Sequence, residues 1–240
     1  HITRDGYCRE CNATIHTLLN IESVVRVLTR SHCSFLRLSW NQHNWTCLTV
    51  ILLRCNDRVR SFRVCVSVFG KSNHTVNRII PALKKISETD ILLVTDNTIE
   101  PNSFDIEQIS YKNFLQNNYV SDYIIISTHP NRHISLLNEY FNFSNNFLIE
   151  KPITIDPKQI LDENFEKLYE NKFIDECLMY THHPLYSKFL DIIKNSKVKK
   201  VEMEFTIPHI NVDNFRYDLK IGGGPIFDLG IYPLSLCLEI

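Results

Sequence analysis

The sequence predicts an α/β protein, with a doubly wound parallel sheet followed by an incomplete, open-sheet α/β second domain. Two observations lead to this prediction. Several short apolar runs, of which Phe147–Ile149 is the clearest, lack polar alternation and so suit strands that are buried on both faces of a sheet. Between them lie longer segments whose apolar residues recur at helical spacing, and strands that alternate with helices build parallel sheets.

The composition is that of an ordinary globular protein. The chain has 240 residues, 44% of them hydrophobic, and a formal net charge of -1. That charge gives no reason to expect nucleic acid or an anionic membrane surface as a partner. No apolar run approaches the roughly 20 residues that a membrane helix needs, and no secretory signal is recognisable. We therefore expect a cytoplasmic protein.

A change in composition divides the chain near residue 61. The first 63 residues contain nine Arg and no Lys, whereas the remainder contains fourteen Lys and three Arg. We interpret residues 1–61 as an extension of uncertain structure, either a fragment or a non-native sequence that was not selected to fold with the rest. Residues 62–151 are predicted to form a first domain, and residues 152–240 a partial second domain.

The extension holds one pair of cysteines with metal-ligand spacing, Cys8 and Cys11. His16, His32 and Cys33 follow as further candidate ligands. A second Cys-x-x-Cys or a closely spaced pair of histidines is missing, so we favour scattered thiols and predict no metal site. A metal-binding module built from these side chains stays as an alternative, which stoichiometric zinc would support.

The first strand of the predicted sheet is Phe62–Phe69, and a glycine turn at Gly70 ends it. A helix follows, with apolar residues on one face over positions 76–86, and Pro81 is predicted to bend or restart it. The next strand is Ile91–Thr95. Strand, turn, helix and strand make one unit of a parallel sheet.

An acidic residue, Asp96, ends the second strand. The order of strand, glycine turn, helix, strand and acid is that of a dinucleotide-binding unit, in which the helix N-terminus faces the pyrophosphate and the acid binds ribose hydroxyls. Only Gly70 of the G-x-G-x-x-G fingerprint is present, because Ser72 and Thr75 stand at its second and third glycine positions. An ordinary turn between a strand and a helix is the alternative.

A third buried strand, Tyr123–Thr128, precedes a helix whose apolar face covers positions 134–141. His129 and His133 lie in or beside the loop between them. Loops that follow parallel strands open on one edge of the sheet, where ligands bind. A surface or capping role is nevertheless the commoner one for a lone histidine.

Lys151 lies directly beyond the buried run Phe147–Ile149. Asp156 and Pro157 then match a helix N-cap and a first-turn proline, and apolar residues at helical spacing follow over positions 160–169. Lys151 is thereby held between two elements, at the carboxyl end of a strand. A solvated hinge lysine is the alternative.

Beyond this hinge the sequence predicts the start of a second α/β layer. Phe173–Tyr180 and Lys199–Ile207 have the composition of strands, and a helix is predicted over positions 185–193 between them. These elements are too few to form a whole second sheet, so we expect that sheet to be incomplete.

A glycine run, Gly222–Pro225, follows and tolerates positive φ and close approach of backbones. If the next segment is helical, Asp228 and Tyr232 share a face, because they are four residues apart. A capping aspartate and a half-buried tyrosine would explain these two residues as well.

Three segments together resemble the Gfo/Idh/MocA family of oxidoreductases. They are Thr128-x(4)-His133, Glu150-Lys-Pro152, and the run Gly222-Gly-Gly-x-x-x-Asp228-x-x-x-Tyr232. The likeness extends in order from about Val64 to Ile240. It includes Pro81-Ala-Leu83, Tyr180, His183-Pro184 and Phe215-Arg-Tyr-Asp218.

The resemblance implies a Rossmann-type domain that binds NAD or NADP, and a second α/β domain whose open sheet supports substrate binding and homo-oligomer contacts in the full-length protein. Lys151 falls on the family's active-site lysine, and Asp228 and Tyr232 fall on its Asp-x-x-x-His/Tyr motif, so these three are the implied catalytic residues. The implied cofactor-binding residues are Gly70, Ser72, Asn73, Thr75, Asp96, Ser127, Thr128, His133, Glu150, Lys151 and Pro152. The implied substrate-binding residues are Lys151, His183, Arg216, Asp228 and Tyr232.

The residue types suit the family's reaction, a hydride transfer between nicotinamide and a sugar or sugar-nucleotide hydroxyl or ketone. The cofactor supplies the redox step, so the protein must move one proton at the substrate oxygen. Lys151 can polarise that oxygen, Tyr232 can donate or accept the proton, and Asp228 can orient them or hold a substrate hydroxyl. Asp96 would repel a 2'-phosphate and so favours NAD slightly over NADP.

The alternative is a non-catalytic ligand-sensing or scaffold protein that keeps this fold. Ser72 and Thr75 in the glycine turn favour that alternative, whereas the joint presence of Lys151, Asp228 and Tyr232 favours the enzyme. Members of the family continue beyond the point where this sequence stops. We therefore expect a truncated chain that lacks part of its second domain and could be inactive as it stands.

Overall fold

The computed structural model describes residues 63–86, 88–96, 105–161, 165, 169–211 and 213–240, and the backbone of residues 7–8, 13–14, 22–29 and 33–39. The chain divides into two compact units. The first unit comprises Leu48–Leu178 and Phe215–Asp228. The second comprises His1–Cys47, Met179–Asn214 and Leu229–Ile240.

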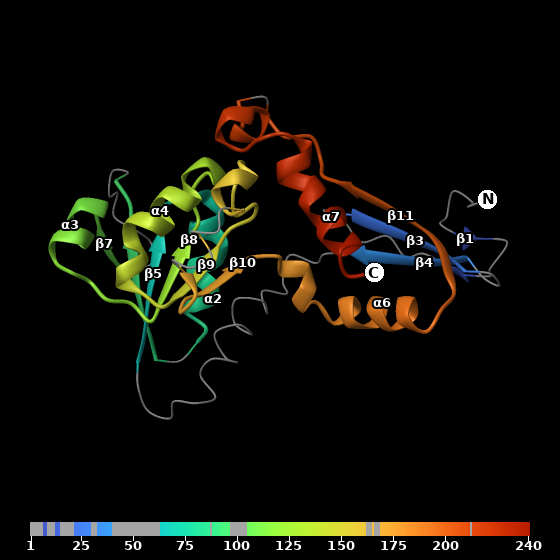
Figure 1. Cartoon of the computed structure of the whole chain (residues 1–240), viewed down its shortest axis with the longest axis horizontal. Coiled ribbons are helices and arrows are strands. Elements are labelled where there is room, and N and C mark those ends of the chain that lie inside the picture. Colours follow the sequence, from blue (N-terminus) through green and yellow to red (C-terminus); the bar gives the residue numbers. More distant parts are fainter. Residues whose placement is uncertain are drawn as a thin grey trace. The chain divides into compact units, whose positions relative to one another are not determined.

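The first unit is built on a sheet of six parallel strands (Figure 1). Across the sheet their order is β10-β9-β8-β5-β6-β7. The chain winds outward from β5 in one direction and then from β8 in the other, which confirms the predicted doubly wound sheet and places its switch point between β5 and β8. In chain order the strands are β5 (Val64–Phe69), β6 (Thr89–Val94), β7 (Glu107–Ile109), β8 (Tyr123–Ile126), β9 (Asn146–Ile149) and β10 (Phe173–Glu176).

Short helices connect these strands. Pro81 lies in the first turn of α2, where a proline needs no N–H partner, so the helix restarts there as predicted. The helices are η1 (Thr75–Ile79) and α2 (Ile80–Leu83) after β5, α3 (Tyr111–Gln116) after β7, and η2 (Pro130–Arg132), α4 (His133–Tyr140) and η3 (Phe141–Phe143) after β8.

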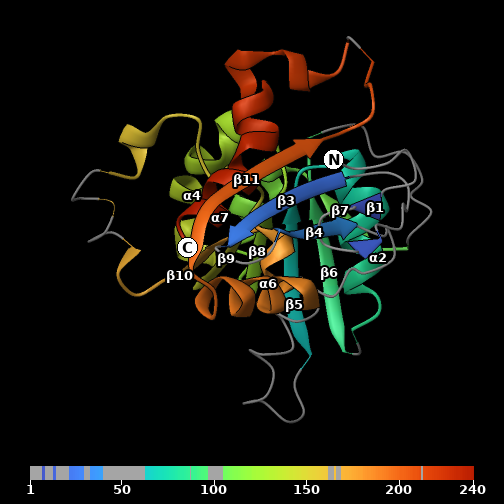
Figure 2. The ribbon, with the colours of Figure 1, turned by 90° about the vertical axis from the view of Figure 1, so that its right-hand side faces the viewer.

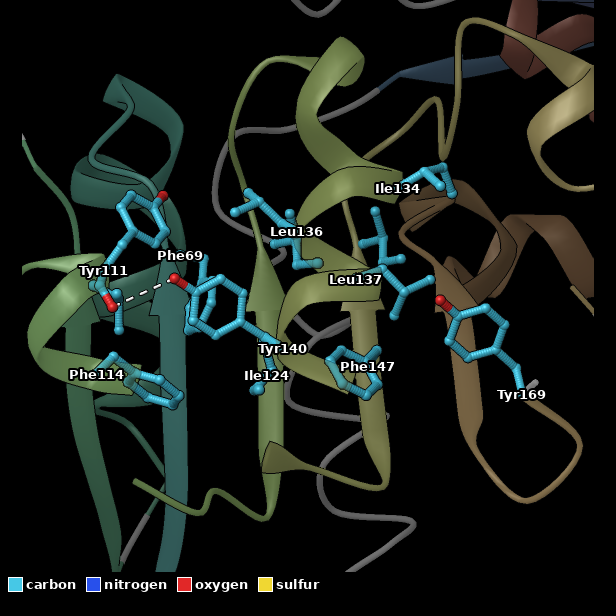
Figure 3. Packing of buried hydrophobic residues seen from close by; sticks show 13 residues of the cluster. Phe69, Tyr111, Phe114, Ile124, Ile134, Leu136, Leu137, Tyr140, Phe147 and Tyr169 are labelled. Carbon is cyan, nitrogen blue, oxygen red and sulfur yellow. Dashed lines mark hydrogen bonds between the residues drawn. The ribbon is translucent and has the colours of Figure 1, made fainter. Parts of the chain in front are cut away.

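Both faces of the sheet are buried, as the absence of polar alternation predicted. Successive residues of β8 point to opposite faces, so Ile125 joins one core cluster and Ile124 the other. In the larger cluster, the ring of Phe69 meets Tyr140 edge-on at 4.7 Å between centroids and Phe114 at 5.1 Å (Figure 3). Since both faces are covered, a ligand can reach the sheet at the carboxyl ends of its strands.

Three elements of the first unit differ from the prediction. β10 was expected to begin a second layer, but it pairs in parallel with β9, with Ile174 opposite Phe147. Ile174 also packs against the larger core cluster, so β10 extends the sheet that the preceding strands build. β7 and α3 were not predicted, because β7 is a three-residue edge strand with a single strongly apolar side chain.

Within the described residues, the helix predicted to begin at Asp156 starts with a single turn, η4 (Pro157–Gln159), and Phe165 and Tyr169 further along are helical. The Asp156 side chain accepts a hydrogen bond from the Lys158 N–H at 3.1 Å, so the predicted N-cap is confirmed. Residues 160 and 161 are not helical, and positions 162–164 and 166–168 of the predicted helix lie outside the described residues.

The second unit contains an antiparallel sheet with the strand order β11-β3-β4 (Figure 2). Its strands are β3 (Glu22–Thr29), β4 (Cys33–Ser39) and β11 (Val198–Thr206), and β1 (Tyr7–Cys8) pairs separately with β2 (Ala13–Thr14). The unit also contains η5 (Met179–His182), α6 (Pro184–Lys194) and α7 (Ile231–Cys237). β11 and α6 confirm the predicted strand and helix.

Part of the N-terminal extension joins this antiparallel sheet. β3 lies between β11 and β4, and its residues pair with those of β11 from Glu22 opposite Thr206 to Thr29 opposite Val198. The composition of the extension did not predict this pairing. The boundaries at residues 61 and 151, and the origin of the extension, stay predictions.

Two further expectations concern metals and membranes. The side chains of the Cys/His set at residues 8–33 lie outside the described residues. Where side chains are described, no group of three or more His, Cys, Asp or Glu could hold a metal ion. Within the same residues, no helix combines the length and the apolar character that crossing a membrane requires.

Candidate active site

Lys151 and Asp228 form a buried ion pair at the carboxyl edge of the parallel sheet. The N–H of Glu150 bonds to the carbonyl of Ile126 at 2.9 Å, so the ladder between β9 and β8 continues up to the residue before Lys151. The Lys151 Nζ donates to the carboxylate Oδ1 of Asp228 at 2.9 Å and to its backbone carbonyl at 2.6 Å. The two side chains are 13% and 11% exposed.

Arg216 binds the other oxygen of the same carboxylate. It lies in η6 (Phe215–Tyr217), and its Nε donates to Asp228 Oδ2 at 2.8 Å. Its guanidinium carbon also lies 4.9 Å from the ring centroid of Phe215. The carboxylate of Asp228 is therefore held between two cations, and the three charges together sum to +1.

The glycine run brings Asp228 to this position. A Cβ on Gly223 would lie 2.5 Å from the carbonyl oxygen of Phe215 and 2.6 Å from that of Arg216, so only glycine allows the two backbones to approach so closely. The N–H of Gly224 bonds to the Arg216 carbonyl at 2.7 Å. Next in the chain is η8 (Ile226–Gly230), in which Asp228 lies, so this part of the segment is helical.

The turn after β5 approaches the end of β8 at the switch point of the sheet. Gly70 has φ +105°, and a Cβ there would lie 2.6 Å from the carbonyl oxygen of Ser127. Ser72 Oγ accepts a hydrogen bond from the Thr75 N–H at 3.0 Å, so a side chain supplies the cap where the fingerprint has glycine. The exposed Asn73 lies between them.

Hydroxyl groups in this turn bond to one another. Thr75 Oγ1 donates to Ser127 Oγ at 3.1 Å and lies 3.0 Å from Ser72 Oγ. Thr75 and Ser127 are almost fully buried. These two side chains therefore hold the turn to β8, and any contact of theirs with a dinucleotide would be made through the backbone.

His133 connects the loop after β8 to the segment that carries Lys151. Its Nδ1 lies 2.9 Å from the carbonyl oxygen of Pro152, and its Nε2 lies 3.1 Å from that of Thr128. The side chain is buried, and burial lowers its pKa, although the two carbonyls act in the opposite direction. The described contacts make His133 a support for these two loops.

Glu150 precedes Lys151 in the chain and contacts His74. Its Oε1 lies 3.1 Å from Nε2 of His74. Burial by itself would raise the pKa of Glu150, but the neighbouring His74, Lys151 and His133 outweigh it and hold this pKa below its ordinary value. Glu150 is therefore a carboxylate at neutral pH.

Asp96 lies beyond β6, as predicted. Its Oδ1 accepts a hydrogen bond from the N–H of Tyr111 at 3.2 Å, the first residue of α3. Its side chain thus tethers the start of that helix, and it is exposed at the same edge as the Gly70 turn. Both the capping role and a contact with ribose are compatible with this geometry.

Tyr232 and His183 belong to the second unit. Tyr232 lies in α7 and stacks on Phe205 of β11, with 4.5 Å between ring centroids and an interplanar angle of 11°. His183 caps α6, because its Nδ1 accepts a hydrogen bond from the Leu185 N–H at 3.1 Å. That these two residues meet Lys151 at one substrate stays a prediction.

The sequence reasoning missed two residues near Lys151. His74 carried no signal beyond its place in the glycine turn. Glu176 lies at the end of β10 and accepts a hydrogen bond from the Ile153 N–H at 2.6 Å, and burial raises its pKa. The position of Glu176 at the end of a strand could have identified it, had the strand been assigned to this sheet.

Comparison with curated proteins finds relatives among reductases. Two are named dTDP-3,4-didehydro-2,6-dideoxy-alpha-D-glucose 3-reductase: one from Saccharopolyspora spinosa, 22% identical over 180 residues, and one from Streptomyces violaceoruber, 24% identical over 191 residues. The matches cover 71% and 75% of this chain, and 54% of each relative. The chain thus spans about half the length of the curated relatives it matches. No protein-family profile matches it.

Solved structures share the fold. KijD10, a 3-ketoreductase from Actinomadura kijaniata solved in complex with NADP and TDP-benzene, superposes with a TM-score of 0.58 at 20% identity, over 73% of this chain and 56% of that one. YvaA from Bacillus subtilis, described as a putative oxidoreductase, gives 0.57 at 13% identity, over 76% and 53%. At such identities the likeness shows the fold.

Proposed function

We propose that this chain, which is similar to proteins named as reductases, is part of an NAD(P)-dependent reductase or dehydrogenase of the Gfo/Idh/MocA type that acts on a sugar nucleotide. The observation that carries the proposal is the ion pair between Lys151 and Asp228 at the carboxyl edge of the sheet. The names of the relatives support the substrate class, a ketone or hydroxyl of a sugar joined to a nucleotide.

The turn at Gly70 fits a dinucleotide. Ligands of such sheets bind at the switch point, which here lies between β5 and β8, and Gly70 lets the turn approach β8 closely. The side chains of Ser72 and Thr75 bond to each other and to the backbone of the turn, so they hold its shape. When bound, the nicotinamide would supply or accept the hydride. We place the ribose at Asp96, which favours NAD slightly over NADP.

Lys151 would bind the substrate oxygen. An ammonium group has three donors, and a donor aimed at an oxygen that gains negative charge stabilises the transition state more than the ground state. Asp228 orients the ammonium through two hydrogen bonds, and Arg216 holds Asp228. Lys151 is thus the catalytic residue that this unit supplies, and Arg216 is a positioning residue.

Tyr232 would move the proton. A phenol near an ammonium group loses its proton more readily, so Tyr232 could donate a proton to a ketone oxygen or take one from a hydroxyl. This step requires the second unit to bring α7 to the edge of the sheet in the full-length protein. His183 is proposed to contact the sugar from the same unit.

A ligand-sensing protein without hydride transfer is the second candidate. The hydroxyl groups of Ser72, Thr75 and Ser127 favour it, because they replace the open glycine turn of dinucleotide-binding enzymes with a bonded cluster. Such a protein would bind its ligand but leave NADH unoxidised when the keto sugar nucleotide is added.

The test uses a full-length protein that contains this chain. Lys151→Ala is expected to abolish turnover of a keto sugar nucleotide while the affinity for NADH or NADPH, followed by nicotinamide fluorescence, stays nearly intact. Lys158→Ala is the matched control, since Lys158 is an exposed lysine seven residues further on. Unchanged turnover in Lys151→Ala would remove this residue from the mechanism, and absence of nicotinamide binding to the wild type would refute the cofactor assignment.

A further inference from the structure

One peptide group beside Lys151 is held at both of its polar atoms by side chains. It joins Pro152 to Ile153, so it begins one residue after Lys151. Its carbonyl oxygen lies 2.9 Å from Nδ1 of His133, the first residue of α4. Its N–H donates to Oε1 of Glu176, the last residue of β10, at 2.6 Å. The proposed function gives Glu176 no role.

Glu176 reaches this peptide from the neighbouring strand. β10 pairs in parallel with β9, and Glu176 lies opposite Ile149, the last residue of β9 (Figure 1). Neighbouring strands are about 4.8 Å apart, so a glutamate side chain at the end of β10 can span the distance to the segment that leaves β9. The register of the sheet therefore places the carboxyl group of Glu176 independently of the loop that it holds.

The chain between this peptide and Lys151 has little freedom. The ring of Pro152 fixes its own φ, and the peptide bond before Pro152 is planar, so few torsions separate the held peptide from the backbone of Lys151. On the other side of Lys151, the N–H of Glu150 bonds to the carbonyl of Ile126 at 2.9 Å. The backbone of Lys151 is thus held from both directions along the chain.

We propose that Glu176 is a positioning residue for Lys151: by accepting the Ile153 N–H, it fixes the backbone that carries the ammonium group. The inference rests on the proposed role of Lys151. Asp228 holds the far end of the lysine side chain at 2.9 Å, and Glu176 holds its base. Misplacing a reacting group by about 1 Å can lower a rate about 100-fold, so both ends must be fixed.

The bond to Ile153 requires an acceptor oxygen and not a charge. A carboxyl group keeps one accepting oxygen even when it is protonated. Glu176→Gln leaves such an oxygen on a side chain of the same length. Glu176→Met keeps nearly the same length and volume but removes the oxygen. These two substitutions therefore separate the loss of the bond from the loss of packing.

The first measurement is hydrogen exchange at the Ile153 amide in the whole chain, followed by NMR. The bond predicts that this amide is protected in the wild type, although it lies outside the helices and strands. Glu176→Met should speed its exchange about tenfold or more, and Glu176→Gln should stay near the wild type. Glu170→Met, at an exposed position before β10, is the matched control and should change nothing.

The second measurement asks whether Glu176 acts on Lys151, and it needs no cofactor. Asp228→Asn weakens the contact that holds the ammonium group, and its effect on the midpoint of urea denaturation is measured in the wild type and in Glu176→Met. If Glu176 positions Lys151, the effect in Glu176→Met should be less than about half of that in the wild type, because the contact is already displaced. Equal effects would mean that Glu176 supports the fold but not Lys151.

The third measurement is steady-state turnover of a keto sugar nucleotide by a full-length protein. Glu176→Met is expected to lower kcat about tenfold to 100-fold and to leave the KM for NADPH unchanged, whereas Glu176→Gln should keep most of the activity. A raised KM for the sugar nucleotide with unchanged kcat would mean that Glu176 contacts the substrate. Equal losses in both variants would mean that the acceptor oxygen is not what matters, and either result overturns the inference.

The first two measurements are independent of the proposed function, because neither uses a nicotinamide or a sugar. A wild type without turnover would refute the function, while exchange and denaturation would still decide whether Glu176 holds Lys151. If Glu176→Met fails to fold, judged by circular dichroism, the wild type and Glu176→Gln decide. An Ile153 amide that is unprotected in the wild type, or that Glu176→Gln exposes fully, overturns the inference.

Discussion

Asp228 is the residue on which the candidate site depends most directly. Its carboxylate accepts hydrogen bonds from Lys151 and Arg216, and its side chain is 11% exposed. Removing one partner of a buried ion pair is strongly destabilising, because the remaining charges lose their compensation.

Asp228→Asn is therefore expected to lower the free energy of unfolding by about 3 kcal/mol. Urea denaturation measures this loss. Asp213→Asn, at an exposed position, is the matched control and should change stability by less than about 0.5 kcal/mol. Equal, small effects of both substitutions would mean that the pair contributes nothing measurable.

His133 makes the stability of the fold depend on pH. Burial lowers its pKa in the folded state, whereas an unfolded histidine titrates near pH 6.5. Between these two values the unfolded chain binds a proton that the folded chain does not, so stability falls as the pH drops below about 6.5.

Urea denaturation at pH 7.5 and 5.5 tests this expectation. The wild type should lose stability over this interval, and His133→Gln should lose less, although it is less stable at pH 7.5 because contacts with Thr128 and Pro152 are weakened. A variant with the same pH dependence as the wild type would show that His133 does not titrate in this range.

Single residues were predicted with uneven success. Lys151 was singled out because it follows a buried strand, and Asp228 because its motif resembles that of the Gfo/Idh/MocA family; the structure brings the two into contact. His74 and Glu176 were missed because their importance comes from contacts between distant elements, with Glu150 and with Ile153, and spacing along the chain does not reveal such contacts.

Among the elements, the glycine run illustrates how backbone shape positions a side chain. Gly223 packs against the carbonyl oxygens of Phe215 and Arg216, at distances that no Cβ could tolerate. The flexible end of a side chain could move aside, but these neighbours are backbone atoms. The loop and η6 must therefore separate if the glycine is replaced.

Gly223→Ala is expected to cost about 1–3 kcal/mol of stability and to displace Asp228 from Lys151. Thermal unfolding measures the first effect. The second should appear as lower turnover of a keto sugar nucleotide by the full-length protein, because Lys151 loses the contact that orients it. An alanine variant with wild-type stability and turnover would contradict the close approach of these backbones.

The sequence predicted which segments are strands better than it predicted the position of each strand in a sheet. The buried runs of β5, β6, β8 and β9 lack alternation, and the structure covers both faces of each. β10 was assigned to the wrong layer, since an apolar run does not specify its neighbours in a sheet. β7 was not predicted, because an edge strand of three residues needs few apolar side chains and so leaves no clear pattern in the sequence.

In the whole molecule, the chain passes between the two units more than once. The first unit includes residues 215–228 as well as 48–178, so the glycine run returns to the parallel sheet after β11. Asp228 and Tyr232 are four residues apart, but belong to different units. Catalysis by both would require the units to meet at the substrate.

Tyr232→Phe in a full-length protein is expected to lower turnover at least about 100-fold, the usual contribution of a general acid or base, and to leave the affinity for NADPH unchanged. Steady-state kinetics and fluorescence titration measure the two effects. Tyr217→Phe, at an exposed tyrosine, is the control. Full activity of Tyr232→Phe would mean that another group moves the proton.

The central claim is that hydride passes between nicotinamide and a sugar carbon at the edge of the parallel sheet. The most direct measurement is to incubate a full-length protein with NADPH or NADH carrying deuterium at the transferable C4 position and with a keto sugar nucleotide, and to analyse the product by mass spectrometry. We expect one deuterium on the carbon of the former ketone, and no transfer in Lys151→Ala. Binding of both ligands by the wild type without deuterium in the sugar would contradict it.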